Sequence, residues 1–182
     1  MLEYCDGGAL REHVCGGADD DDKERALRPF KLSAALDVAR AMAHCNNTAS
    51  FDPPLLHRDI KGDNVLMLSQ TEAETALNAG RGPWQAKLAD FGESRQMEEN
   101  QEAMGEMTMV GTAFWIAPEV YMNEYYDEKC DVFSFGMLLL EMWLRESAKY
   151  KNMEYTLDDG TSSGRAFYSV LLNCTIFRTR TV

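Results

Sequence analysis

The chain has 182 residues, of which 45% are hydrophobic and 26% are charged, which suits one globular domain with a buried core. The formal net charge of −12 argues against a protein that binds nucleic acid or anionic membranes, because both need a cationic surface. The charge would suit basic partners or substrates, although a solvated acidic surface explains it more simply.

Cysteine usage predicts a reduced, intracellular protein. The cysteines stand at positions 5, 15, 45, 130 and 174 and form no C-x-x-C pair, so neither a disulfide framework nor a zinc site is expected. The first residues lack a basic segment followed by a long apolar run, which predicts no signal peptide. Because no stretch of about 18 apolar residues is free of charge, no membrane span is predicted. We therefore expect a cytoplasmic location.

The first part of the chain is expected to hold a short helix, a loop and a long helix. Residues 1–14 are predicted to form a strand end that turns into a short helix, and residues 16–25 (GGADDDDKER) a flexible acidic loop. A second helix is predicted over 30–47, with Pro29 at its start. Its buried face would consist of Leu32, Ala35, Leu36, Ala39, Met42 and Ala43.

A small β-hairpin is predicted next. Pro53-Pro54 favour an extended backbone before Leu55-Leu56. Two short apolar runs, Val65–Leu68 and Ala86–Ala89, are predicted as the strands of the hairpin. The segment between them, Ser69–Gln85, is predicted to be a lengthened hairpin loop.

One segment near the end is strongly apolar. Residues 93–110 before it are polar and acidic, and we expect them to be mobile. Cys130–Trp143 is apolar on every side of a helix, which predicts a helix in the interior of a domain. Membrane burial is the alternative, but the segment is short and contains Asp131 and Glu141.

Three short motifs carry the candidate chemistry. In chain order they are residues 57–64 (HRDIKGDN), 90–92 (DFG) and 117–119 (APE). Any one of them alone would be weak evidence, because a tripeptide such as Asp-Phe-Gly arises by chance, usually in a turn. The ordered set, with the second motif directly after a predicted strand, is a strong signal that the three motifs belong to one functional site.

The residue types suit a reaction in which the protein mainly positions groups and neutralises charge. Asp90 and Asn64 offer the hard oxygen ligands that Mg²⁺ prefers. Asp59 can orient an acceptor hydroxyl and take its proton, and Lys61 can bring positive charge to the transferred group from the same loop. The alternative is that these residues are ordinary surface charges or a carboxylate–lysine pair.

These motifs resemble the catalytic signature of the eukaryotic protein kinase family, and the resemblance covers residues 1–144. It implies an α+β, protein-kinase-like fold, represented here by the mainly α-helical C-terminal lobe with a small β-hairpin. The family's Gly-rich loop and strand lysine have no match in the chain, so the N-terminal lobe is expected to be missing. Residues 145–182 are expected to be a divergent tail.

The resemblance also implies a site for ATP and Mg²⁺. Leu2–Cys5 together with Gly7-Gly8 resemble the hinge between kinase lobes, with Leu2 as the gatekeeper. The implied binding residues are Glu3 and Cys5, whose backbone would bind adenine, Leu66 and Ala89 in the floor and back of the pocket, and Asn64 and Asp90 as the Mg²⁺ ligands.

The resemblance favours a serine or threonine acceptor. Gly111–Ile116 resembles the substrate-docking loop of serine/threonine kinases, and Thr112 within it would bond to Asp59 and Lys61 as part of the catalytic set. The position of Lys61 favours the same acceptor type. The run Asp131–Gly136 is most like the tyrosine-kinase-like group of these kinases.

Position in the family's pattern implies further roles. Asp131 would tie the catalytic loop to the core, and His57 and Phe91 would belong to a hydrophobic spine. Arg58 would bind a phosphate on the activation segment, with Thr108 as the candidate acceptor.

The leading hypothesis is therefore a Mg·ATP-dependent protein serine/threonine kinase that acts on a protein substrate. The alternative is a non-catalytic kinase-lobe fragment that serves as an interaction module, because half of the ATP cleft is expected to be absent. On that ground we expect the isolated chain to be weakly active or inactive. A small-molecule phosphotransferase with a kinase-like fold is a third possibility, but such enzymes generally lack the segment from Asp-Phe-Gly to Ala-Pro-Glu.

Overall fold

The computed structural model describes residues 3–15, 21–47, 49–71, 75, 82–96, 115–121 and 124–144. The chain divides into two units, Met1–Ala148 and Lys149–Val182, and the described residues all belong to the first. The expected tail, most of the hairpin loop and most of the segment expected to be mobile lie outside the described residues.

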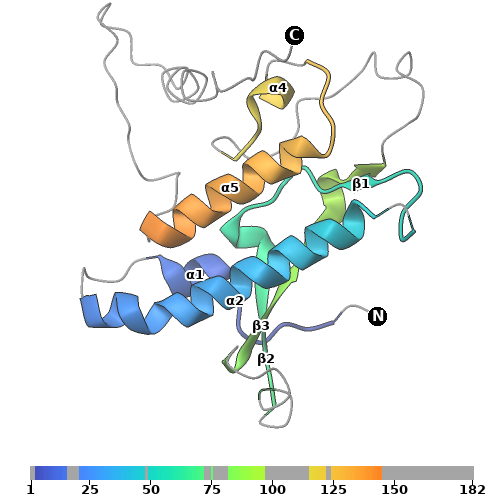
Figure 1. The fold of residues 1–182 in the computed structure, drawn as a ribbon. Coiled ribbons are helices and arrows are strands. Elements are labelled where there is room, and N and C mark those ends of the chain that lie inside the picture. Colours follow the sequence, from blue (N-terminus) through green and yellow to red (C-terminus); the bar gives the residue numbers. More distant parts are fainter. Residues whose placement is uncertain are drawn as a thin grey trace, which may run out of the picture. The chain divides into compact units, whose positions relative to one another are not determined.

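Two long helices and two small antiparallel sheets make up most of the described part of the chain (Figure 1). The helices are α1 (Leu10–Val14), α2 (Asp21–Cys45), α4 (Pro118–Tyr121) and α5 (Lys129–Leu144). The strands are β1 (Leu55–Leu56), β2 (Val65–Ser69), β3 (Trp84–Leu88) and β4 (Arg95–Gln96). Strand β1 pairs with β4, and β2 pairs with β3. Helix α2 contacts both β3 and α5, and α2 and α5 run side by side in Figure 1.

The predicted hairpin is confirmed as β2 and β3, with each strand one or two residues longer than expected on the loop side. The extended segment before α1 lies along the free edge of β2. Gly7 donates its N–H to the Met67 carbonyl at 2.8 Å, and Met67 donates to the Gly8 carbonyl at the same distance. A Cβ at Gly7 would lie 2.7 Å from that Met67 oxygen, so this close approach requires glycine.

Helix α2 begins earlier than the sequence suggests. The predicted loop, residues 16–25, is already helical from Asp21, and Pro29 lies inside the helix rather than at its start. The segment 21–28 (DDKERALR) explains the difference. Its aspartates suit the positive end of the helix dipole, and the residues that follow are mostly good helix formers.

The predicted buried face of α2 is correct only in part, because Met42 is buried and Ala35 and Ala39 are half-buried, but Leu32, Leu36 and Ala43 are exposed. Leu32 is 65% exposed and Leu36 is 45% exposed, whereas a neighbouring face is buried. That face contains Ala34, Val38, Met42 and Cys45, together with the polar residues Lys31, Ser33 and Asp37. Because Asp37 accepts a hydrogen bond from the Ala86 N–H at 3.2 Å, this polar side chain can face the hairpin.

Helix α5 confirms the predicted helix over 130–143, but not the prediction that all its sides are covered. Among the described residues, Val132 is 54% exposed and Trp143 is 62% exposed. The buried side carries Cys130, Asp131, Ser134, Met137, Leu138, Glu141 and Met142. The apolar content of a helix predicts that the helix packs against the rest of the domain. It does not predict which side of the helix is buried or which polar residues lie on that side.

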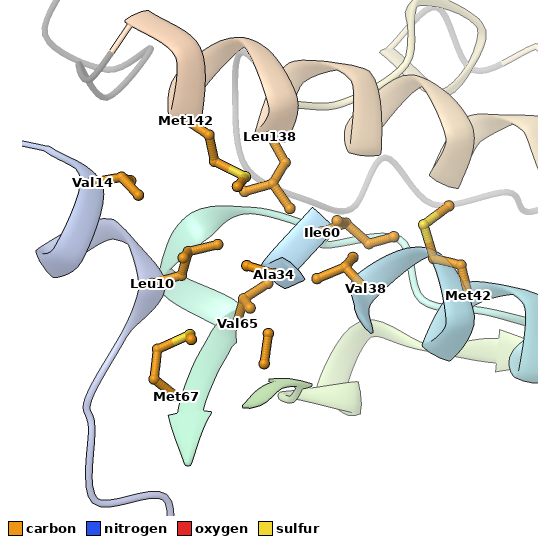
Figure 2. Packing of buried hydrophobic residues seen from close by; sticks show 11 residues of the cluster. Leu10, Val14, Ala34, Val38, Met42, Ile60, Val65, Met67, Leu138 and Met142 are labelled. Atoms are coloured by element: carbon orange, nitrogen blue, oxygen red, sulfur yellow. The ribbon is translucent and has the colours of Figure 1, made fainter. Parts of the chain in front are cut away.

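One hydrophobic core joins these elements, and Figure 2 shows its side chains converging. It is built from Leu10 and Val14 of α1, Ala34, Val38 and Met42 of α2, Ile60, Val65 and Met67 of β2 and the loop before it, Ala86 of β3, and Leu138 and Met142 of α5. The loop that carries residues 57–64 is thus fixed between α5 and the hairpin.

Candidate active site

The loop 57–64 is held at its start by a buried carboxylate of α5. Asp131 Oδ2 accepts the backbone N–H of His57 at 2.7 Å, and Asp131 Oδ1 accepts that of Arg58 at 2.8 Å. Only 2% of Asp131 is exposed, and this burial raises its pKa. The predicted tie between Asp131 and the catalytic loop is therefore present as two hydrogen bonds.

Arg58 occupies an unusual backbone conformation at this point. Its φ is 66°, in the left-handed region that costs a non-glycine residue about 1–3 kcal/mol. Its side chain donates to the Glu93 carbonyl at 2.6 Å and to the Tyr126 hydroxyl at 3.1 Å. Arg58 thus bridges the loop to the segment after the second motif and to the segment before α5.

The three predicted residues of the loop meet at one oxygen atom. Lys61 Nζ donates to Asp59 Oδ2 at 2.6 Å, and Asn64 Nδ2 donates to the same oxygen at 2.7 Å. Asn64 Nδ2 also bonds to the Asp59 backbone carbonyl at 2.8 Å. Asp59 and Asn64 are both buried, so the two donors act on the Asp59 carboxyl group in a site that is shielded from solvent.

His57 connects this loop to the residue before the second motif. Its Nδ1 accepts the Asp59 N–H at 3.3 Å, so the ring proton belongs on Nε2, which lies 3.1 Å from the Ala89 carbonyl. Burial lowers the pKa of His57, which keeps the ring neutral in this arrangement. The ring also packs edge-on against Phe91, with 4.6 Å between the ring centroids. The hydrophobic spine expected to include these two residues stays a prediction.

Asp90 follows β3 directly, beside the catalytic loop. The Ala89 N–H donates to the Asn64 carbonyl at 2.9 Å, which extends the β2–β3 ladder by one pair beyond Val65 and Leu88. Asp90 has a left-handed backbone, with φ of 61° and ψ of 71°. Its side chain is exposed, and Oδ1 accepts the Gly92 N–H at 3.3 Å. The structure therefore brings the Asn64 and Asp90 segments together.

The residues expected to bind adenine lie along the hairpin. Leu66 of β2 is half-buried, is bridged to Ala9 and lies opposite Lys87 of β3. Glu3 is exposed and forms an ion pair with Lys87 at 3.4 Å. The first segment therefore reaches the face of the hairpin that carries Leu66. Cys5 and Ala89 are half-buried.

Three residues given roles by the sequence lie outside the described residues: Leu2, Thr108 and Thr112. Within the described part, the structure assembles Asp59, Lys61 and Asn64 in direct contact and places Asp90 one residue beyond the strand pair that joins them.

Comparison with known proteins decides the family. The family model described as "protein kinase domain" matches residues 1–171. The chain belongs to the protein kinase family. The kinase match continues past residue 144, where we predict the boundary between the kinase lobe and the tail, and that boundary stays a prediction.

Curated relatives of this kinase chain include proteins of three distant organisms. A probable serine/threonine-protein kinase of Dictyostelium discoideum is 36% identical over 147 residues, covering 81% of this chain and 13% of the relative. A probable LRR receptor-like protein kinase of Arabidopsis thaliana is 32% identical over 85% of this chain and 16% of the relative. Dual specificity testis-specific protein kinase 1 of Homo sapiens is 30% identical over 88% of this chain and 22% of the relative. The kinase chain therefore spans less than a quarter of each of these proteins.

The helices and small antiparallel sheets of this kinase chain agree with the mixed helical and strand character expected of the family. Within the described residues, no helix is both long and apolar enough to cross a bilayer. The assignment to the tyrosine-kinase-like group stays a prediction.

Sequence reasoning missed a second buried acid at the site. Glu141 of α5 accepts the Gly62 N–H through Oε2 at 3.2 Å, although 79 positions separate the two residues. Only 2% of Glu141 is exposed. Its one sequence signal is a carboxylate that follows a run of apolar residues in the helix. Because such a group needs polar partners when buried, that signal could have marked it.

Proposed function

We propose that the protein is a serine/threonine kinase, which transfers the γ-phosphoryl group of ATP to a hydroxyl group of a protein substrate. The observation that carries this proposal is the convergence of Lys61 Nζ and Asn64 Nδ2 on Asp59 Oδ2, at 2.6 and 2.7 Å. A buried carboxylate with two fixed donors has one defined orientation, which positional catalysis requires. Membership of the protein kinase family supports the same reaction class.

In this mechanism, Asp59 accepts the proton of the substrate hydroxyl as the hydroxyl oxygen forms a bond to the γ-phosphorus. The bond from the γ-phosphorus to its bridging oxygen breaks, and ADP leaves with that electron pair. Lys61 places a cation beside both Asp59 and the transferred group, and Thr112 is proposed to complete the set by bonding to Asp59 and Lys61. A positioned base of this kind contributes roughly 10²–10⁴ in rate.

We propose Asn64 and Asp90 as the ligands of Mg²⁺. Asn64 uses Nδ2 for both bonds to Asp59, and Asp90 uses Oδ1 for its bond to Gly92. Each side chain therefore has an oxygen that makes no bond to another described residue. No group of three or more His, Cys, Asp or Glu side chains among the described residues could hold a metal ion alone. This donor set fits a cation that also takes phosphate oxygens, and bound Mg²⁺ would neutralise phosphate charge.

Leu66 offers a test of the adenine site with a matched control. Leu66 and Leu68 are both half-buried and share one face of β2, but Leu66 lies nearer Asp90. Leu66→Ala is expected to weaken ATP binding about tenfold, because losing most of a leucine contact costs about 1.5 kcal/mol. Leu68→Ala should change it less than about threefold. Titration with a fluorescent ATP analogue measures both, and equal effects would contradict the placement of adenine over Leu66.

The function itself is tested on the protein at its natural length. ATP labelled in the γ-phosphate is supplied with Mg²⁺ and matched basic peptides that carry Ser, Thr or Tyr. We expect label on Ser and Thr peptides and little on the Tyr peptide. Label on all three would replace this proposal by dual specificity, and a protein that binds ATP or partners without transferring label would favour the interaction-module alternative.

A further inference from the structure

Helix α5 carries two buried acids that face the catalytic loop at its two ends. Asp131 binds the backbone at His57 and Arg58, and Glu141, ten residues further along the helix, binds it at Gly62. Ten helical residues span about 15 Å, and the two positions lie within about 80° of one another around the axis. The base Asp59 lies in the loop between these two attachments.

Glycine at position 62 leaves room for Glu141 to approach the loop backbone this closely. A Cβ on Gly62 would lie 2.9 Å from Glu141 Oε2 and 3.2 Å from the Cβ of Arg11. Gly62 also begins the short 3-10 helix Gly62–Asn64, whose last residue holds Asp59. A shift of Gly62 would therefore move the donor that fixes the proposed base.

Trp115 brings a third segment to the same acid. Glu141 Oε1 and Trp115 Nε1 are both buried, and neither makes a hydrogen bond with another described residue. The indole N–H is nevertheless near enough to Glu141 to lower the pKa of that carboxyl. Helix α5 also binds the backbone of Trp115, because Ser134 Oγ donates to the Trp115 carbonyl at 2.6 Å. Trp115 lies two residues before the Ala-Pro-Glu motif.

We propose that Glu141 is a positioning residue, whose carboxylate fixes the catalytic loop through Gly62 and joins it to the segment that carries Trp115. This inference rests on the proposed function. The Gly62 N–H favours the ionised form for this task, because it can only donate to Glu141. The charged side chains that face Glu141 are Arg11 of α1 and Asp63 of the 3-10 helix, and they pair with each other at 2.6 Å.

Burial disfavours the ionised form of the Glu141 carboxyl group. Burial, with Asp63 adding to it, raises the pKa of Glu141 to about 7 from its usual 4.5, while Gly62, Arg11 and Trp115 oppose the rise. The carboxyl group is thus divided between its two forms near neutral pH. The contribution of Glu141 to folding stability is complete below its unfolded pKa near 4.5 and falls as pH rises to about 7. Activity is expected to change in the opposite direction, because the ionised form orders the loop.

Glu141→Gln tests this in the natural-length kinase, since glutamine keeps the shape and cannot ionise. We expect kcat at pH 8 to fall about tenfold, with KM for ATP within about twofold of wild type. The rise in wild-type kcat near pH 7 should be missing from the variant, while its free energy of unfolding at pH 8 should match or exceed that of wild type. Asp37→Asn, which changes another buried acid, should leave the pH profile of kcat unchanged.

Trp115→Phe supplies the matched partner change, because it keeps an aromatic ring and removes the indole N–H together with the five-membered ring that carries it. Its effect on kcat should be smaller in Glu141→Gln than in wild type, as expected for two groups that act through one contact. Additive effects, or a wild-type pH profile in Glu141→Gln, would overturn the positioning role. If Asp59→Asn retains full activity, the proposed function itself fails, whatever Glu141 does.

If Glu141→Gln does not fold, a fluorescence titration that requires no catalysis still tests the proposal. The fluorescence of Trp115, taken as wild type minus Trp115→Phe, should titrate with a midpoint near pH 7, because protonation of Glu141 changes the group beside the indole. A difference signal that stays flat from about pH 5 to 9 would contradict contact between Trp115 and a titrating Glu141.

Discussion

Asp131→Asn is expected to reduce kcat roughly 100-fold and to lower the free energy of unfolding by about 1–3 kcal/mol. Asp131 accepts two backbone N–H groups with two oxygens, and asparagine has only one oxygen to offer. Its amide N–H₂ would face either the His57 or the Arg58 N–H, leaving one buried donor unsatisfied. The left-handed Arg58 backbone would lose part of the support that holds it there.

Asp127→Asn is the matched control for this change. Asp127 stands just before α5, and its carboxylate binds the Lys129 N–H at 2.9 Å and the Lys129 ammonium at 2.7 Å. Asparagine still accepts at such a position, and an exposed ion pair contributes about 1 kcal/mol or less. Denaturant unfolding and steady-state kinetics should therefore separate the two variants. Equal losses would show that the contacts of Asp131 with the catalytic loop have no special importance.

Asn64→Asp is the second substitution with a large expected effect, and we expect it to lower kcat at pH 7 about 100-fold. Asn64 Nδ2 makes two bonds to Asp59, at 2.8 and 2.7 Å. Aspartate would replace this donor by a second carboxylate against Asp59 Oδ2. Two carboxylates so close cannot both ionise easily, so a proton is retained between them and the base is occupied. Lys61, which stays beside Asp59, would offset only part of the added negative charge.

Asn64→Asp leaves an oxygen ligand at position 64, so Mg²⁺ binding is expected to survive. The change in kcat then reports on the contact between position 64 and Asp59. The pH at which kcat is half-maximal should rise in the variant, because the shared proton leaves at higher pH. Asn47→Asp adds the same charge at an exposed residue whose Oδ1 only accepts the Ala49 N–H, and it should behave as wild type. An unchanged pH profile in Asn64→Asp would contradict the role given to Asn64 in holding Asp59.

Local signals predicted much of this fold correctly. The two short apolar runs indicated β2 and β3, because each is as long as a typical strand and the segment between them contains glycine and proline residues that favour a loop. The motif 57–64 indicated Asp59, Lys61 and Asn64 as one site, and the structure joins them by hydrogen bonds. The helix over 130–143 also followed from local composition.

The buried face of α2 did not follow from the sequence. Leucines mark a helix face only if that face meets the core, and here Leu32 and Leu36 are exposed while Val38 is buried. The side that packs includes Asp37, which looks polar in the sequence but is bonded to the backbone of β3. The helix position is thus set by a contact between distant segments, which periodicity does not report.

The second acid of the site escaped detection for the same reason. The role proposed for Glu141 depends on its neighbours Gly62, which is 79 positions away, and Trp115. Its carboxylate contributes no local pattern, unlike the contiguous residues of a motif. Long-range polar contacts of this kind become visible only when burial and partner are known together.

The most direct test of the proposed chemistry is a single-turnover measurement of phosphoryl transfer from Mg·ATP to a Ser or Thr peptide by the natural-length protein. Wild type is compared with Asp59→Asn and with Asp52→Asn, an exposed aspartate seven positions earlier. We expect Asp59→Asn to slow the transfer step by roughly 10²–10⁴ with ATP binding unchanged, and Asp52→Asn to match wild type. Equal transfer rates in wild type and Asp59→Asn would contradict the assignment of Asp59 as the base.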